Sequence, residues 1–297
     1  MFSRILFPTD FSAYSDAVLV CLPDLQTAGL REVVLLSVIR GSDVPMPEII
    51  NRASLEYWRW SLGERLNVAR MALEGKGLRV LTRIEYGNPV EHIVRIAEEE
   101  RVELIVMGAQ GATAAQELLI GSTAYEVIRR ATLPVLLQKF EVIRELGHIR
   151  CRQVCENIFQ RVLHPTDFSE CADAAFQVVK RLKAAGTEEV FVLHVQDERL
   201  MKQRPSEQLT EFDRHDTDRL EALSKTLRLF DLQAHPMLRH GIPFREALKA
   251  AEEIDASLIV LGSHGRSAVR EMLAGSTFEN VVRLSRHPVL VIRPQRK

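Results

Sequence analysis

The sequence predicts an α/β protein built from two tandem domains, each a five-stranded parallel sheet with helices on both faces. Two observations predict this fold class. Short apolar and β-branched segments alternate with segments of helical period, which is typical of a parallel sheet whose strands are joined by crossover helices. The same motifs then recur in the same order in the second half of the chain, which indicates an internal duplication.

Pairs of matching segments carry the evidence for the duplication. One pair is ILFPTDFS at 5–12 and VLHPTDFS at 162–169, and another is GAQGATAAQELLIGST at 108–123 and GSHGRSAVREMLAGST at 262–277. The first pair lies 157 residues apart and the second 154, so the second copy lacks three residues in between. We predict the following division of the chain: domain 1 at 1–138, a linker at 139–158 and domain 2 at 159–297.

Local patterns predict the elements of the first copy in order. An apolar segment at 4–8 predicts the first strand, and PTDFS after it predicts a turn into a helix with Ser12 as N-cap. Residues 32–39 (EVVLLSVI) predict a buried strand, and a glycine with two prolines predicts a loop at 41–50. The later elements are a helix over 55–73, a strand at 78–86, a helix over 90–97, a strand at 104–107, a helix over 124–131 and a strand at 133–138.

Composition argues against several classes of protein. The 297 residues are 46% hydrophobic and 27% charged, and the net charge of −1 predicts no nucleic-acid partner. No apolar run approaches the roughly 18 residues of a membrane span, and four unevenly placed cysteines predict a reduced, cytoplasmic protein. His148, Cys151 and Cys155 have a spacing that suits zinc, but the fourth ligand of a structural site is missing nearby, so we predict no metal site.

Three features of each copy lie where ligands bind in open α/β sheets, beyond the carboxyl ends of the strands. The first is the frame Gly-x2-Gly-x9-Gly-Ser-Thr after the fourth strand, whose glycines let a ligand approach the main chain. The second is the start of the last helix, where free N–H groups and the helix dipole favour a phosphate. The third is PTDFS, which places Asp10 and Asp167 at the same edge, where a carboxylate suits ribose hydroxyls.

Each of these features also has a purely structural explanation. Glycine after a strand can serve a tight turn, and the two aspartates can be turn or N-cap residues. Thr123-x-x-Glu126 and Ser276-x-x-Glu279 read as capping boxes, which would use the same N–H groups as a phosphate. We favour a ligand site because the three features converge on one sheet edge in both copies. No nucleophile–base pair recurs in both copies, so we predict no catalytic residue.

The side chains around the shared motifs differ between the copies. Arg266 can pair with a phosphate, whereas the first copy has alanine at that position, which predicts tighter triphosphate binding in the second copy. His164 and His194 of the second copy stand where the first has Phe7 and Ser37, so we expect both histidines to be packed strand residues rather than bases.

These motifs resemble the universal stress protein family. The resemblance rests on PTDFS, a Gly-x-Pro before the third helix, and the glycine frame followed by a helix and x-Pro-Val-Leu, and it covers nearly everything except the linker. It implies a Rossmann-like fold of the adenine nucleotide alpha hydrolase type, with strand order 3-2-1-4-5. It also implies an intramolecular pseudo-dimer, in which the last strands at 133–138 and 287–293 pair antiparallel, and a homodimer as a further assembly. The glycine frame is the signature of the family's ATP-binding branch.

Carried over by position, the resemblance implies an adenine nucleotide (ATP, ADP or AMP, with or without Mg²⁺) in each copy. Adenine would be held by backbone groups around Val38 and Val195, adenosine would lie near the aspartates, and the glycine frames would hold the phosphates. The residues implied for the first copy are Pro8, Thr9, Asp10, Val38, Gly108, Gly111, Gly121, Ser122 and Thr123. Those implied for the second copy are Pro165, Thr166, Asp167, Val195, Gly262, Gly265, Arg266, Gly275, Ser276 and Thr277.

We therefore expect an adenine-nucleotide-binding stress-response sensor or regulator with at most slow hydrolysis. Fast phosphoryl transfer needs metal ligands, a water-positioning residue and charge stabilisers, and the sequence offers few candidates. Two alternatives stay open. One is a slow ATPase or an autophosphorylating protein, with Ser122, Thr123, Ser276 or Thr277 as phosphate acceptors. The other is a scaffold whose glycine frames are only structural.

Overall fold

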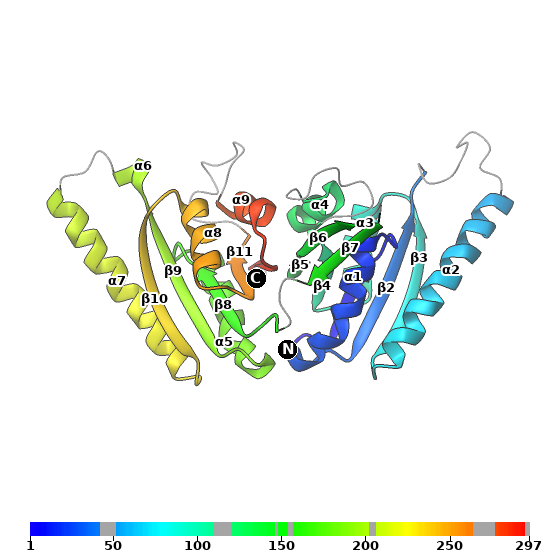
Figure 1. The fold of residues 1–297 in the computed structure, drawn as a ribbon, viewed down its shortest axis with the longest axis horizontal. Coiled ribbons are helices and arrows are strands. Elements are labelled where there is room, and N and C mark those ends of the chain that lie inside the picture. The colour runs from blue at the N-terminus through cyan, green and yellow to red at the C-terminus, as the bar shows by residue number, and fades with distance from the viewer. Residues whose placement is uncertain are drawn as a thin grey trace. The chain divides into compact units, whose positions relative to one another are not determined.

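A computed structural model describes the backbone of residues 1–41, 52–109, 120–145, 148–153, 157–201, 206–263 and 277–294 (Figure 1). The chain divides into two units, residues 1–153 (unit 1) and residues 154–297 (unit 2). Apart from Gly41, the loop predicted at 41–50 lies outside the described residues.

Unit 1 contains a sheet of five parallel strands in the order β3-β2-β1-β4-β5. The strands are β1 (Arg4–Pro8), β2 (Glu32–Ile39), β3 (Arg79–Tyr86), β4 (Leu104–Gly108) and β5 (Val135–Gln138). The strand order 3-2-1-4-5 is confirmed, and each strand begins and ends within two residues of its predicted range.

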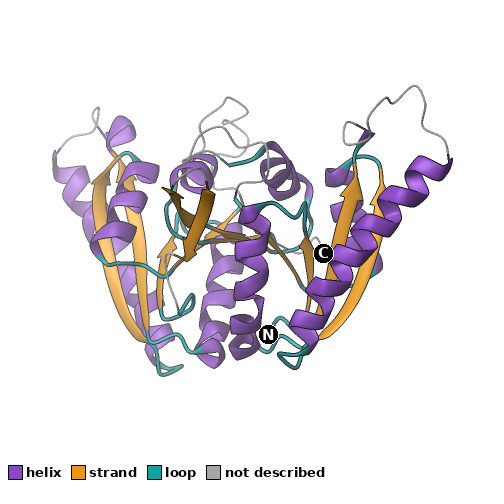
Figure 2. Cartoon of the chain, turned by 45° about the vertical axis from the view of Figure 1, so that its right-hand side comes forward, coloured by secondary structure: helices purple, strands orange, loops and turns teal. Residues whose placement is uncertain are grey.

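Helices cover the sheet of unit 1 on both faces (Figure 2). They are α1 (Ala13–Cys21), the short 3-10 helix η1 (Leu22–Ala28), α2 (Arg52–Glu74), α3 (Pro89–Glu99) and α4 (Ser122–Arg130). The prediction of Ser12 as N-cap is confirmed, because its Oγ accepts a hydrogen bond from the Ser15 N–H at the start of α1. Packing of α2 on β2 and β3, and of α3 beside α4, brings four helix ends near the carboxyl edge of the sheet.

Unit 2 repeats this architecture, with strand order β10-β9-β8-β11-β12. Its strands are β8 (Arg161–Pro165), β9 (Glu189–Asp197), β10 (Gln233–Gly241), β11 (Leu258–Gly262) and β12 (Val289–Ile292). Its helices are α5 (Glu170–Arg181), the 3-10 helix η4 (Leu182–Ala185), α6 (Glu198–Met201), α7 (Ser206–Arg228), α8 (Pro243–Glu253) and α9 (Thr277–Leu284). Strand registers agree as well: Phe7 pairs with Leu35 in unit 1, and His164 pairs with Val192 in unit 2.

Burial explains why the central strands read as continuous apolar runs. Residues 33–36 of β2 and residues 104–106 of β4 are completely buried. A strand covered by helices on both faces has no water-facing side, so every position favours an apolar side chain. The edge strand β3 differs, since its Leu81 is 37% exposed. The pattern therefore places the core on the inner strands of each sheet.

The predicted linker contains a β-hairpin that the sequence did not predict. β6 (Phe140–Glu145) and β7 (His148–Gln153) pair antiparallel, and β7 runs beside α1 of unit 1. The side chains of this hairpin, and Cys155 altogether, lie outside what the structure describes, so the prediction of no metal site there stays a prediction. No helix in the described ranges is both long and apolar enough to cross a membrane.

Gly262, at the end of β11, has a packing role that is independent of any ligand. A Cβ at this position would lie 2.8 Å from the backbone carbonyl of Cys171 in α5. Gly262→Ala is therefore expected to lower the free energy of unfolding by about 1–3 kcal/mol, because strand or helix must shift. Gly63→Ala in α2 is the matched control, since its Cβ would meet nothing closer than 4.0 Å and should stabilise the helix by about 0.5–1 kcal/mol. Urea unfolding measures both, and a neutral Gly262→Ala would contradict the close approach.

Candidate functional site

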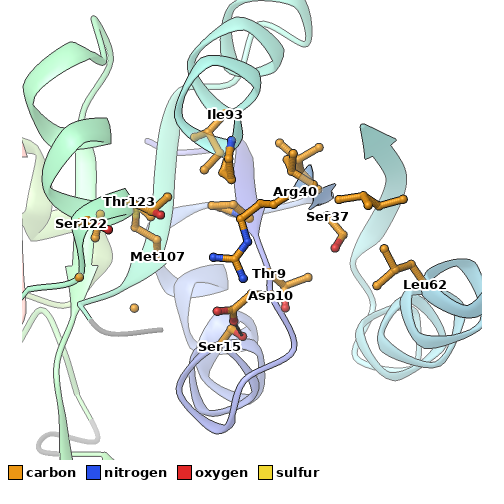
Figure 3. Close-up of a pocket in the computed structure, with 18 of the residues that line it drawn as sticks. Thr9, Asp10, Ser15, Ser37, Arg40, Leu62, Ile93, Met107, Ser122 and Thr123 are labelled. Carbon is orange, nitrogen blue, oxygen red and sulfur yellow. Dashed lines mark hydrogen bonds between the residues drawn. The ribbon is translucent and has the colours of Figure 1, made fainter. Parts of the chain in front are cut away.

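A cavity of about 330 Å³ opens at the carboxyl edge of the unit 1 sheet (Figure 3). Its walls come from the ends of β1, β2 and β4 and from helices α1, α2, α3 and α4. The lining residues are Pro8, Thr9, Asp10, Ser15, Leu36, Ser37, Val38, Ile39, Arg40, Trp58, Leu62, Arg65, Pro89, Ile93, Met107, Gly108, Gly121, Ser122, Thr123 and Ala124. The volume falls in the range of small-molecule sites, which is roughly 300–1,000 Å³.

The cavity brings together the residues that the sequence predicts for the first copy. Eight of the nine line it, namely Pro8, Thr9, Asp10, Val38, Gly108, Gly121, Ser122 and Thr123. The ninth, Gly111, lies outside the described part of the chain. Residues from four separate segments of the sequence therefore meet in one space.

The PTDFS segment forms a tightly bonded turn at the end of β1. Thr9 Oγ1 accepts the Phe11 N–H at 3.0 Å, which helps to hold Phe11 in the left-handed region at φ 53°. Asp10 Oδ1 accepts the Ser12 N–H at 3.0 Å and the hydroxyls of Ser12 and Ser15 at 2.6 and 2.7 Å. The turn explanation for Asp10 is thus correct, and the same turn fixes its carboxylate at the cavity wall.

The start of α4 forms the opposite wall of the cavity. Gly121 is the N-cap, with extended backbone angles and no side chain to accept a hydrogen bond, and Ser122 is the first helical residue. The alternative of a Thr123–Glu126 capping box is therefore not formed: Thr123 lies two residues after the N-cap, and Glu126 pairs with Arg129 and Arg130. The first residues of α4 line the cavity, and the N-cap Gly121 has no side chain to accept a hydrogen bond from their N–H groups.

Two arginines, which the sequence did not single out, give the cavity positive charge. Figure 3 shows Arg40, just after β2, reaching across the cavity towards Asp10. Arg65 of α2 lies over the Phe11 ring, 4.2 Å from its centroid, and donates to the Phe11 carbonyl at 3.2 Å. Burial raises the pKa of the neighbouring Asp16, Arg65 opposes this shift, and Asp10 adds to it. A negatively charged ligand is favoured at this mouth.

The α2 wall is the other part that the sequence missed. Leu62 and Trp58 share an apolar helical face with Leu66, which is buried in the core, yet both line the cavity. A hydrophobic period gives the direction of a face but does not show whether a side chain or a ligand fills the space opposite. The cavity becomes apparent only when residues of other elements, such as Ile93 of α3, are seen to line the same space.

Several residues predicted for the second copy lie at the same edge of unit 2. Pro165 ends β8, Val195 lies in β9, Gly262 ends β11 and Thr277 begins α9. Asp167 Oδ1 accepts the Ser169 N–H at 3.1 Å, and Phe168 has φ 59°, so the PTDFS turn is repeated. Thr166 is buried and its Oγ1 accepts the Phe168 N–H. The predicted residues Gly265, Arg266, Gly275 and Ser276 lie outside the described ranges.

Comparison with known proteins agrees with this architecture. Residues 1–139 and 158–293 each match the model of the universal stress protein family. Universal stress protein MJ0577 of Methanocaldococcus jannaschii is 34% identical over 155 residues, which cover 46% of this chain and 96% of that protein. Universal stress protein Rv2005c of Mycobacterium tuberculosis is 27% identical over 274 residues, covering 88% of this chain and 85% of that protein.

A solved structure extends the similarity to the fold of the chain. The crystal structure of a universal stress protein from Archaeoglobus fulgidus is 27% identical in sequence, with a TM-score of 0.74, and the match covers 98% of this chain and 96% of that one. With two matches to the family model, the repeated strand order and the doubled PTDFS turn, the chain belongs to the universal stress protein family and carries its domain twice in tandem.

Proposed function

We propose that the cavity of unit 1 binds an adenine nucleotide and that the protein acts as a nucleotide-dependent sensor or regulator in a stress response. The observation that carries this proposal is the meeting of three chemically different walls in one cavity. An apolar wall, a carboxylate and a helix N-terminus match the base, the sugar and the phosphates of one ligand.

The apolar wall suits a purine base. Val38, Ile39, Leu62 and Ile93 approach the space from β2, α2 and α3. Small-molecule sites are mostly apolar with a few placed polar groups, and the main chain at the end of β2 supplies such groups beside Val38. A flat base fits between a strand end and two helix faces.

The polar walls suit the sugar and the phosphates. A carboxylate accepts hydrogen bonds and so suits ribose hydroxyls, and Asp10 is fixed at the cavity wall by its turn. The N-terminus of α4 offers backbone N–H groups, the positive end of the helix dipole, and the hydroxyls of Ser122 and Thr123. Arg40 adds a positive charge between the two ends.

A regulatory role is favoured over rapid catalysis by the chemistry of the lining residues. The described cavity wall has one carboxylate, Asp10, and its Oδ1 already accepts three hydrogen bonds. Slow hydrolysis, or transfer of a phosphoryl group to Ser122 or Thr123, is the alternative, because both hydroxyls lie at the proposed phosphate end. The pairing of the last strands, the homodimer and the cytoplasmic location remain predictions.

The proposal is tested by denaturing the purified full-length chain and identifying any released nucleotide by mass spectrometry. We expect an adenine nucleotide, or, if purification strips it, micromolar binding of added ATP, which corresponds to about −8 kcal/mol. Radiolabelled ATP distinguishes the alternative, since covalent label or steady phosphate release would indicate an enzyme. The absence of released nucleotide, together with no thermal shift on adding ATP, ADP or AMP, would contradict the proposal and favour a scaffold.

A further inference from the structure

The cavity wall of unit 1 has a counterpart in unit 2 that is built from different chemistry. Strand registers align Ser37 and Ile39 of β2 with His194 and Gln196 of β9. Helix α2 aligns with α7 at an offset of 154 residues, which places Asp216 at the position of Leu62. This helix alignment is supported by geometry, because Arg219 lies over the Phe168 ring at 3.8 Å as Arg65 lies over Phe11 at 4.2 Å.

In unit 2 these three side chains contact one another and bridge β9 to α7. Gln196 Nε2 donates to Asp216 Oδ2 at 3.0 Å, and His194 Nε2 lies 3.4 Å from the same oxygen. The His194 ring is fixed on its other side, where Nδ1 donates to the Thr166 carbonyl at 2.7 Å and the Phe168 ring lies 4.6 Å away. Gln196 is only 2% exposed, and the side chains of His194 and Asp216 are 15% and 14% exposed, so the cluster is largely buried.

The same positions in unit 1 leave the space between strand and helix free for a ligand. Ser37, Ile39 and Leu62 all line the cavity, and Figure 3 shows Ser37 on β2 and Leu62 on α2 facing it from separate elements. Ile39 and Leu62 carry no polar atom that could bridge the gap. The apolar wall of unit 1 thus becomes a hydrogen-bonded cluster in unit 2.

The charge after the second strand also differs between the two units. The position of Arg40 in unit 1 is taken by Asp197 in unit 2. Both carboxylate oxygens of Asp197 accept hydrogen bonds from Arg199, and this arginine lowers the pKa of Asp197. An ion pair between Asp197 and Arg199 therefore stands where unit 1 has the cation Arg40, so this position offers a polyphosphate less positive charge.

We propose that His194, Gln196 and Asp216 form a selectivity cluster that keeps the adenine base out of unit 2, so that the chain binds one adenine nucleotide, in unit 1. This inference rests on the proposed function of unit 1. To enter unit 2 as it enters unit 1, a base would have to break the hydrogen bond from Gln196 Nε2 to Asp216 Oδ2, and both freed groups would lack that partner. Unit 1 then binds ATP more tightly than unit 2, whereas Arg266 alone predicts tighter binding by unit 2.

The test is the stoichiometry of ATP binding to the full-length chain, measured by native mass spectrometry and equilibrium dialysis. We expect one ATP per chain, and expect Thr123→Asp in unit 1 to remove it. The exchange variant His194→Ser/Gln196→Ile/Asp216→Leu gives unit 2 the residues of unit 1 and should add a second ATP, with at least a tenfold gain in affinity at that unit. The reverse exchange, Ser37→His/Ile39→Gln/Leu62→Asp, should abolish binding in unit 1.

The outcomes separate this inference from the function it rests on. A wild-type chain that binds two ATP molecules with affinities within threefold would overturn the selectivity cluster and leave the nucleotide-binding function standing. A single ATP that survives Thr123→Asp but is lost with Thr277→Asp would overturn it too, because the occupied unit would be unit 2. No binding to the wild type or to either exchange variant would overturn both. Two ATP molecules on the wild type would overturn the inference by themselves, so this outcome does not depend on the exchange variants folding.

Discussion

Thr123→Asp is expected to weaken ATP binding by unit 1 about 100-fold, while the chain stays as stable as the wild type or becomes slightly more stable. Thr123 is the second residue of α4 and lines the cavity. A carboxylate in the first turn of a helix is favoured by the helix dipole by about 0.3–1 kcal/mol. The same carboxylate would repel a phosphate, and a unit charge about 4 Å away opposes it by roughly 4 kcal/mol near a protein surface.

Thr123→Asn is the matched control, because asparagine has nearly the shape of aspartate without its charge. We expect it to lose less than about tenfold in affinity. Isothermal titration gives the affinity and thermal unfolding gives the stability of both variants. If Thr123→Asp binds ATP within threefold of Thr123→Asn, no phosphate lies at the start of α4, and the proposed orientation of the nucleotide is wrong.

Unit 2 is expected to lose stability in mild acid through two buried histidines that unit 1 lacks. His164 is completely buried; its Nδ1 donates to the Val260 carbonyl at 2.9 Å, and its Nε2 has no hydrogen-bond partner among the described residues. Burial lowers the pKa of His164 and of His287, and backbone hydrogen bonds oppose the shift only in part. Unit 1 has Phe7 and Leu133 at these positions.

The direction of the pH effect follows from these lowered pKa values. Both histidines are neutral in the folded chain, whereas in the unfolded chain they take up protons near pH 6.5. Folded unit 2 therefore keeps its full stability above about pH 6.5 and loses it as the pH falls, by about 1.4 kcal/mol per pH unit for each histidine.

His164→Phe tests this effect by giving unit 2 the residue of unit 1. The stability difference between variant and wild type should grow in favour of the variant by about 1 kcal/mol from pH 6.5 to pH 5.5. Hydrogen exchange of peptides from β8 and β11 measures it within unit 2. Peptides from β1 and β4 of unit 1 serve as the internal control, since their exchange should not respond to the substitution. A difference that stays constant with pH would show that His164 is not neutral in the folded state.

The strands could be predicted because their causes are local, whereas their order was implied by the resemblance to the universal stress protein family. Runs such as 32–39 are apolar at successive positions because helices cover both faces of β2, and this pattern depends on no distant residue. The PTDFS turn is likewise local, since Thr9 and Asp10 bond to N–H groups two residues on. The same local patterns occur in both copies, so each strand and the PTDFS turn could be predicted from two segments of the sequence.

The cavity walls could be predicted only where a motif marked them. Trp58, Leu62 and Arg65 lie far from the glycine frame in sequence and reach the cavity through the packing of α2 on β2 and β3. Arg40 is also far from that frame and reaches the cavity from the end of β2. The capping box at Thr123 and Glu126 does not form because the helix begins earlier, with Gly121 as its N-cap. The spacing of Thr123 and Glu126 alone does not show where the helix begins.

The change from apolar to polar residues between the two units is present in the sequence, but the contact that it forms is not apparent there. His194 was expected to be a packed strand residue, and it is only 15% exposed, which agrees. Its contact with Asp216, however, joins β9 to α7, and Asp216 lies 22 residues later in the sequence. Aligning the two copies at Leu62 and Asp216 would have placed the change of polarity at the proposed base site.

The most direct measurement of the central claim is a crystal structure of the full-length chain grown with a non-hydrolysable ATP analogue. We expect the base beside Val38 and Leu62, the ribose at Asp10, and the phosphates on the N–H groups of Ser122 and Thr123 at the start of α4. An analogue bound elsewhere, or a unit 1 cavity that stays empty at saturating concentrations of a ligand shown to bind in solution, would contradict it.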